Sequence, residues 1–184
     1  MANITEEHIT DLMLTGGNAG MKALYDKYVG SLTALCSRYL GNEDDVKDVL
    51  QEVFIKVFTQ FRSFKFRGEG SLSAWVARIA VNMSINHLKN AGRMVTVRDE
   101  KVTANIAEGA EEPDSEGIPP DELQRMIMSL PDGYRTVINL YVFEGKSHKE
   151  IADILNIKAK TSASQLYHAK AMMAKKINEY KNKH

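Results

Sequence analysis

The sequence predicts an all-α protein made of two small helical domains. Apolar residues recur at helical spacing through most of the 184 residues, whereas strand-like alternation is nearly absent, apart from a short stretch near Val95. The acidic segment AEGAEEPDSEGIPP interrupts the helical pattern and holds three of the four prolines. We therefore expect a first domain over residues 1–92, a flexible acidic linker over 93–119 and a second domain over 120–184.

Four helices are expected in the first half. Thr5 can cap a short helix that ends at two glycines, and a second helix follows from about Asn18 to Leu40. Asn42 can cap a third helix, whose first turn carries three carboxylates that suit the positive end of the helix dipole. A basic loop, FRSFKFRGEGS, separates this helix from a fourth helix that opens at Ser71.

The third helix has the cleanest apolar stripe in the chain. Its members are Val46, Val49, Leu50, Val53, Phe54, Val57, Phe58 and Phe61. The other face is polar and is formed by Asp45, Asp48, Gln51, Glu52 and Lys56. In the region that follows, we assign Trp75 mainly to the core. Phe64 and Phe66 could belong either to the core or to a pocket for an extruded base, and both alternatives stay open.

The second half predicts helices at about 121–130, 132–143, 148–155 and 160–180. The stretch SHKEIADILNIKAKTSASQLYHA (147–169) has the outline of a helix-turn-helix. Ser147 and Glu150 fit a capping box, and Asn156 stands at the break, where a left-handed residue is often needed. The expected outward face consists of Lys158, Lys160, Thr161, Ser164, Gln165, His168 and Lys170. Gln165 could contact an adenine, since glutamine can donate and accept in one bidentate contact.

The charge pattern favours two polyanion contacts. The net charge is zero, but residues 62–101 carry 8 basic and 3 acidic side chains, and residues 134–184 carry 10 and 4. The single cysteine, Cys36, excludes an internal disulfide and fits a cytoplasmic location. We see no signal peptide, membrane span, phosphate loop, nucleophile motif or metal-ligand spacing. We therefore expect no enzyme activity, metal, cofactor or small-molecule substrate.

Residues 130–177 resemble the fourth conserved region of bacterial sigma factors. The resemblance rests on Leu130, Pro131, Arg135, Val137, Glu144, Gly145, Ser147, Glu150, Ile151, Ala152, Thr161, Ser164, Leu166 and Ala169. The stretch DDVKDVLQEVFIKVF (44–58) and the helix after it resemble the second conserved region, through Asp48, Gln51, Phe54, Trp75, Arg78, Ile79 and Asn82. Two regions with no third domain between them are similar to the extracytoplasmic-function (ECF) type. The resemblance covers about residues 19–92 and 120–178.

The resemblance implies a protein that binds core RNA polymerase and promoter DNA, and that has an anti-sigma factor as a partner. Region 2 would dock on the polymerase clamp through Asp45, Asp48, Gln51, Glu52 and Lys56. It would hold the minus-ten element through Arg62, Lys65, Arg67, Arg78, Asn82, Asn86 and Lys89. Region 4 would read the minus-thirty-five element through the outward face given above and touch the polymerase flap.

Several residues depart from the family pattern. Ser162 stands where valine is frequent, Gln165 and His168 where basic residues are frequent, and Asn86 and Lys89 where aspartate and arginine are usual. These departures bear on the promoter sequence rather than on the fold. The alternative is a helix-turn-helix regulator whose N-terminal half is a sensing or dimerising domain.

Overall fold

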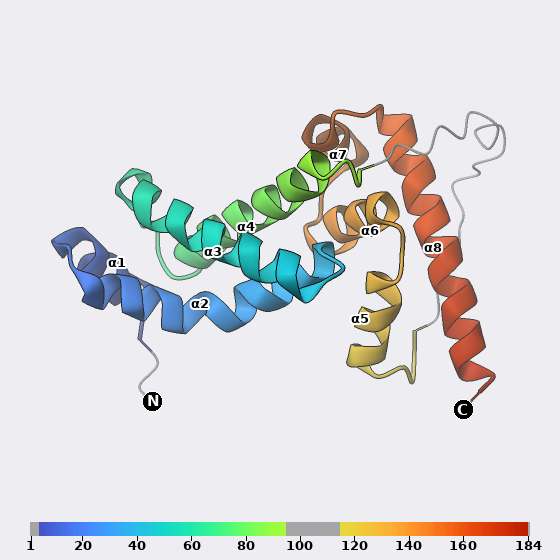
Figure 1. Cartoon of the computed structure of the whole chain (residues 1–184), viewed down its shortest axis with the longest axis horizontal. Helices are drawn as coiled ribbons and strands as arrows, with labels where there is room; N and C mark the ends of the chain where they lie inside the picture. The colour runs from blue at the N-terminus through green and yellow to red at the C-terminus, as the bar shows by residue number, and fades with distance from the viewer. Residues whose placement is uncertain (1–3, 95–114, 184) are drawn as a thin grey trace. The chain divides into compact units, whose positions relative to one another are not determined.

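The computed structural model describes residues 4–94 and 115–183, and every regular element in these ranges is helical (Figure 1). The prediction of an all-α fold is therefore confirmed. The chain divides into two compact units, Met1–His87 and Leu88–His184. The predictions near Val95 and for most of the acidic linker fall on residues 95–114, outside the described residues.

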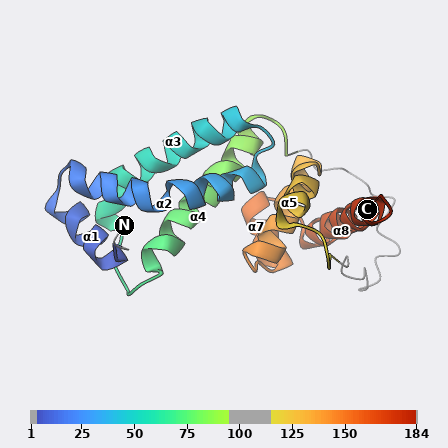
Figure 2. The ribbon, with the colours of Figure 1, turned by 90° about the horizontal axis from the view of Figure 1, so that it is seen from below.

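The described part of the first unit, from residue 4 on, is built from four helices. They are α1 (Glu6–Thr15), α2 (Asn18–Tyr39), α3 (Glu43–Gln60) and α4 (Ser71–Asn90), whose last three residues are counted with the second unit. A 3₁₀ turn, η1 (Phe61–Ser63), closes α3. Helix α2 packs against α1 and α3, and Figure 2 shows the four helices gathered in one bundle. The stripe predicted on α3 forms part of its core, since Val49, Val53 and Val57 are fully or almost fully buried.

Local residues set the helix starts of this unit as expected. The Thr5 side chain accepts a hydrogen bond from the His8 backbone N–H, and the Asn42 side chain accepts one from Asp45 N–H at 2.7 Å. Gly20 lets α1 close against α2, because a Cβ at this position would lie 2.7 Å from backbone atoms of Leu12 and Met13. The N-terminal helix is therefore an integral part of the first unit.

The second unit contains α5 (Pro120–Met128), α6 (Asp132–Ile138), α7 (His148–Leu155) and α8 (Ala159–Lys181). These match the predicted helices within two residues, with one exception. The predicted helix over 132–143 turns into a π-helical segment, η2 (Asn139–Phe143), which exposes Tyr141, Val142 and Phe143. Helix α8 packs against α5, α6 and α7 (Figure 1).

A buried arginine braces the turn between α5 and α6. Arg135 is 2% exposed and donates from Nη1 to the carbonyl oxygens of Met128 (2.7 Å) and Leu130 (3.0 Å). It also pairs with Asp132. Burial lowers the pKa of Arg135, and Asp132 opposes that shift. Arg135 therefore donates hydrogen bonds to two carbonyl groups, one at the end of α5 and one just after it, where no further helical N–H group is available as a donor.

Candidate nucleic-acid and partner interfaces

The helix-turn-helix forms through the local signals that predicted it. The Ser147 side chain accepts from Glu150 N–H at 3.3 Å, and the Glu150 carboxylate accepts from Ser147 N–H at 2.8 Å. Hydrogen bonds from Ser147 lower the pKa of Glu150. Asn156 ends α7 in the left-handed region, with φ of 57°. The predicted capping box and left-handed turn are both confirmed.

A polar contact joins the two helices of this motif. His148 Nδ1 lies 3.0 Å from the Ser162 hydroxyl, and its ring stacks on Tyr141 with centroids 4.9 Å apart. Burial lowers the pKa of His148, so the neutral ring is favoured in the fold. His148 is half-buried in this joint. Ser162, the departure from valine, thus has a partner at the joint.

The expected outward face of α8 needs correction at two positions. Gln165 is 6% exposed and Ser164 is 9% exposed, so neither lies on the open face. Gln165 follows Ser162 by three residues and precedes Ala169 by four, which places it on the same side of the helix as these two buried residues. No described residue hydrogen-bonds its Oε1 atom. Gln165 is therefore a buried polar residue rather than a free base reader.

The accessible face of α8 runs through other residues. Lys158 and Lys160 are exposed, and Thr161 and Lys170 are half-exposed. Tyr167 was not among the residues expected on this face; it is half-exposed and makes an edge contact with the His168 ring at 5.6 Å. The only sequence feature that could have pointed to Tyr167 is its aromatic side chain at a position beside the buried apolar residues of α8, such as Leu166 and Ala169.

His168 is held in place rather than free at the surface. Its ring stacks on Tyr134 of α6 with centroids 5.7 Å apart, and the residue is half-buried. The expectation that His168 lies on the surface is thus only half right. The same His168 ring meets the Tyr167 ring edge to face.

The polar face of α3 is open at three of its five predicted positions. Asp48, Gln51 and Glu52 are exposed, whereas Lys56 is half-buried. Asp45 is also half-buried, contrary to the prediction of an exposed carboxylate. It accepts hydrogen bonds from Asn42 Nδ2 at 2.7 Å, and lies 3.1 Å from His87 Nε2.

An exposed isoleucine completes this face. Ile55 is 55% exposed and lies three and four residues after Glu52 and Gln51, so it shares their side of α3. Ile55 was not predicted for this face, because it is apolar and lies outside the apolar stripe. The row of Asp48, Gln51, Glu52 and Ile55 combines polar groups with one solvent-exposed apolar side chain, a composition that suits a protein interface.

The first basic block is accessible along a loop and one helix face. Arg62, Lys65 and Arg67 are exposed in and before the loop that leads to α4. Arg78, Asn82 and Asn86 are also exposed, and their spacing of four residues places them in one row on α4. Lys89, at the end of that helix, is half-buried.

An aromatic cluster anchors the start of this loop. Phe64 packs on Trp75 with ring centroids 5.1 Å apart, and on Phe61 at 5.6 Å. Phe61 and Trp75 meet edge to face at 5.9 Å. Of the two aromatics left open, Phe64 joins this cluster although it is only half-buried, whereas no ring contact among the described residues joins Phe66 to the cluster.

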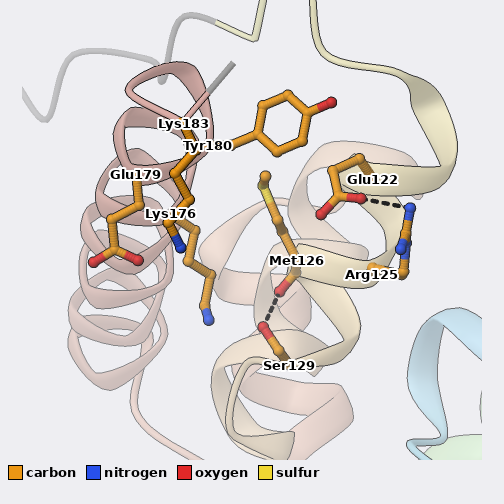
Figure 3. A pocket seen from close by; sticks show the side chains of 8 residues that line it. All are labelled: Glu122, Arg125, Met126, Ser129, Lys176, Glu179, Tyr180 and Lys183. Atoms are coloured by element: carbon orange, nitrogen blue, oxygen red, sulfur yellow. Dashed lines mark hydrogen bonds and ion pairs between the residues drawn. The ribbon is translucent and has the colours of Figure 1, made fainter.

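The second unit also has an open groove of about 620 Å³ between α5 and α8 (Figure 3). Its lining carries both signs of charge, with Lys176 and Glu179 of α8, Lys183 just beyond that helix, and Glu122 of α5, which is paired with Arg125. Such a mixed lining suits neither a polyanion nor a metal ion. Among the described residues no three His, Cys, Asp or Glu side chains are placed to hold a metal, and no helix is long and apolar enough to cross a membrane.

Comparisons with known proteins identify both units. The family model of sigma-70 region 2 matches residues 24–94, and that of sigma-70 region 4 matches residues 121–173. The ECF RNA polymerase sigma-E factor of Haemophilus influenzae is 30% identical over 187 residues, covering 95% of this chain and 96% of that protein. The sigma-E factor of Escherichia coli K12 is 31% identical over 186 residues, covering 95% of each.

A solved structure shares the fold. It is the sigma factor RpoE from Bartonella quintana in complex with the anti-sigma factor NepR, with a TM-score of 0.51, 20% identity, and coverage of 85% of this chain and 96% of that one. The alternative of a regulator with a sensing N-terminal half is not supported, because that half matches sigma region 2. The chain belongs to the ECF sigma factors of the sigma-70 family, which direct RNA polymerase to promoters and catalyse no reaction of their own.

Proposed function

We propose that the exposed row on α3 is the surface that docks on core RNA polymerase. The observation that carries this proposal is the exposure of Ile55 among Asp48, Gln51 and Glu52, on the face opposite the buried stripe. Asp45 contributes indirectly, since its bonds to Asn42 and His87 fix the first turn of the helix. Lys56 lies at the edge of the surface.

Charge reversal tests this docking surface. Asp48→Lys should weaken core binding at least about tenfold, since like-charge juxtaposition costs several kcal/mol at an interface. The matched control is Asp44→Lys on the same helix, because Asp44 is exposed and pairs with its neighbour Lys47 at 3.5 Å. Equal loss of binding in both variants, or none in Asp48→Lys, would place the docking surface elsewhere.

Promoter recognition is assigned to the two basic surfaces. The first domain, residues 1–92, would hold the minus-ten element with Arg62, Lys65, Arg67, the row of Arg78, Asn82 and Asn86, and Lys89 at the end of α4. Opening this element requires bases to be unstacked, at a few kcal/mol per step, and an extruded base then needs a pocket. The exposed cations and the ring of Phe66 suit such a pocket.

The second domain, residues 120–184, would read the minus-thirty-five element with the first half of α8. Lys158, Lys160 and Thr161 suit phosphates, aided by the backbone N–H groups at the helix start. Tyr167, supported by His168, would lie against bases, and Lys170 would continue the phosphate contacts. Lys160→Ala should weaken binding to all promoters alike, whereas Tyr167→Ala should change preference at one or two base pairs.

The partners follow from these surfaces. The exposed apolar segment Tyr141, Val142 and Phe143 would contact the polymerase flap. The Bartonella quintana structure holds an anti-sigma factor, and we propose that a protein inhibitor of this kind also binds the present chain. Because it works with the polymerase, we place the protein in the cytoplasm.

A further inference from the structure

The carboxylate of Glu6 is buried at the meeting point of three segments of the first unit. The residue is 3% exposed. One oxygen accepts hydrogen bonds from the Tyr28 hydroxyl (2.7 Å) and Ser73 N–H (3.0 Å). The other accepts from Gly70 N–H (2.8 Å) and Leu72 N–H (2.9 Å). One side chain of α1 thus ties α2 to the start of α4.

These bonds supply α4 with a cap that its own sequence lacks. The first N–H groups of a helix have no acceptor within the helix, and the preceding residue usually supplies one from its side chain. Here that residue is Gly70, which has no side chain. The cap comes instead from a residue 64 to 67 positions away in the chain.

The electrostatics of the site favour the charged form. Burial acts to raise the pKa of Glu6, but hydrogen bonds from Tyr28 and from the backbone of Leu72, Ser73 and Gly70 bring it below its usual range. Burial and the neighbouring Glu6 raise the pKa of Tyr28, so its hydroxyl stays a donor. A carboxylate at a helix N-terminus is also stabilised by the helix dipole.

The same contacts fix the end of the basic loop. Glu6 N–H donates to the Glu69 carboxylate at 2.9 Å, next to the bond from Gly70. The Ser71 hydroxyl donates to the Gly68 carbonyl at 2.6 Å and accepts from Arg67 N–H at 3.2 Å. The loop is therefore held at its start by the aromatic cluster and at its end by Glu6.

We propose that Glu6 is a positioning residue for recognition of the minus-ten element. It holds the loop over residues 64–70 in the one conformation that presents Lys65, Phe66 and Arg67 together to the DNA. A loop fixed before binding loses less conformational entropy on binding, which raises affinity without any direct contact. This inference rests on the proposed role of the loop in binding the minus-ten element.

The test uses holoenzyme assembled from the full chain and core polymerase, with a labelled single-stranded minus-ten oligonucleotide as the probe. Glu6→Gln keeps the shape but turns one oxygen into a donor that faces backbone N–H groups. We expect oligonucleotide affinity to fall about tenfold or more while core affinity stays within about twofold. Glu7→Gln is the matched control, because Glu7 is exposed and adjacent; it should bind like the wild type.

Two further measurements separate positioning from general destabilisation. Glu6→Asp keeps the charge with a shorter reach and should restore part of the affinity that Glu6→Gln loses. Trp75 is the only tryptophan and packs on Phe64 at the base of the loop. Its emission should therefore shift in Glu6→Gln and not in Glu7→Gln. If Glu6→Gln does not fold, Glu6→Asp and Tyr28→Phe, which both keep the carboxylate, should show smaller losses of the same kind.

The outcomes distinguish this inference from the function on which it rests. Lys65→Ala and Arg67→Ala test the loop itself, and unchanged oligonucleotide binding in both would refute its proposed role. If those variants weaken binding but Glu6→Gln binds like the wild type, the positioning role is wrong. Parallel loss of core binding and oligonucleotide binding in Glu6→Gln would show a purely structural role and also overturn it.

Discussion

Replacing Gly20 or Gly30 of α2 by alanine should change the free energy of unfolding in opposite directions. A Cβ on Gly20 would lie 2.7 Å from Leu12 C and Met13 N and 2.8 Å from Leu12 O, all backbone atoms of α1. A Cβ on Gly30, ten residues further along α2, would meet nothing within 4 Å. The Gly20→Ala and Gly30→Ala variants therefore have the same amino-acid composition, but the added methyl group meets different surroundings in each.

The magnitudes follow from these distances. Alanine favours the helix over glycine by about 1 kcal/mol at either position. At Gly20 the gain is outweighed by overpacking, which typically costs about 1–3 kcal/mol, because α1 must move away from α2. We expect Gly20→Ala to lower the free energy of unfolding by up to about 2 kcal/mol and Gly30→Ala to raise it by about 0.5–1 kcal/mol.

Urea unfolding followed by Trp75 fluorescence measures both effects, since the only tryptophan lies in the first unit. Displacement of α1 should also disturb Glu6, so Gly20→Ala should bind the minus-ten oligonucleotide less tightly than Gly30→Ala. If both variants are stabilised to the same degree, the close approach of α1 and α2 is wrong, and so is the packing that places Glu6 at α4.

Three predictions concern the second unit and can be followed by hydrogen exchange of α8 amides. Gln165→Met should stabilise the unit by about 1 kcal/mol, because it removes a buried acceptor that has no described partner. It should leave promoter preference unchanged, and an altered preference would indicate that Gln165 reads a base. Arg135→Leu should destabilise the unit by about 3 kcal/mol, because two carbonyl groups lose their buried donor and Asp132 loses one of its arginine partners, Arg93 being another. A loss under about 1 kcal/mol would contradict the bracing role. The pKa of His148 is lowered in the fold, so its stabilising contribution is complete above the unfolded pKa of about 6.5 and is lost as pH falls below it. His148→Gln should flatten this part of the pH profile, and an unchanged profile would assign the effect to another group.

Local signals in the sequence predicted the helices and their caps. Thr5, Asn42 and Ser147 act through hydrogen bonds to residues three positions away, so their role can be deduced from neighbouring residues. The apolar stripe of α3 could also be predicted, because the spacing of apolar residues along a single helix is visible in the local sequence. The π-helical segment at Asn139 had no such signal.

Features that depend on distant residues could not be deduced in this way. Glu6 and Glu7 are adjacent, identical in type and equally suited to a first helical turn, yet only Glu6 reaches α4. The accessible face of α8 was misjudged because Ser164 and Gln165 were placed outward on polarity alone. Packing against neighbouring helices decides which polar residues are covered, and it left Tyr167 accessible instead.

Promoter selection by the reconstituted holoenzyme tests whether the chain carries two separate promoter-reading surfaces. Full-length chain and core polymerase would be incubated with a random promoter library, and the transcribed templates sequenced for the wild type, Tyr167→Ala and Arg67→Ala. We predict two enriched elements at a fixed spacing, with Tyr167→Ala relaxing only the upstream element and Arg67→Ala weakening only the downstream one. A single enriched element, or the same change in both variants, would contradict the assignment of two separate promoter-reading surfaces.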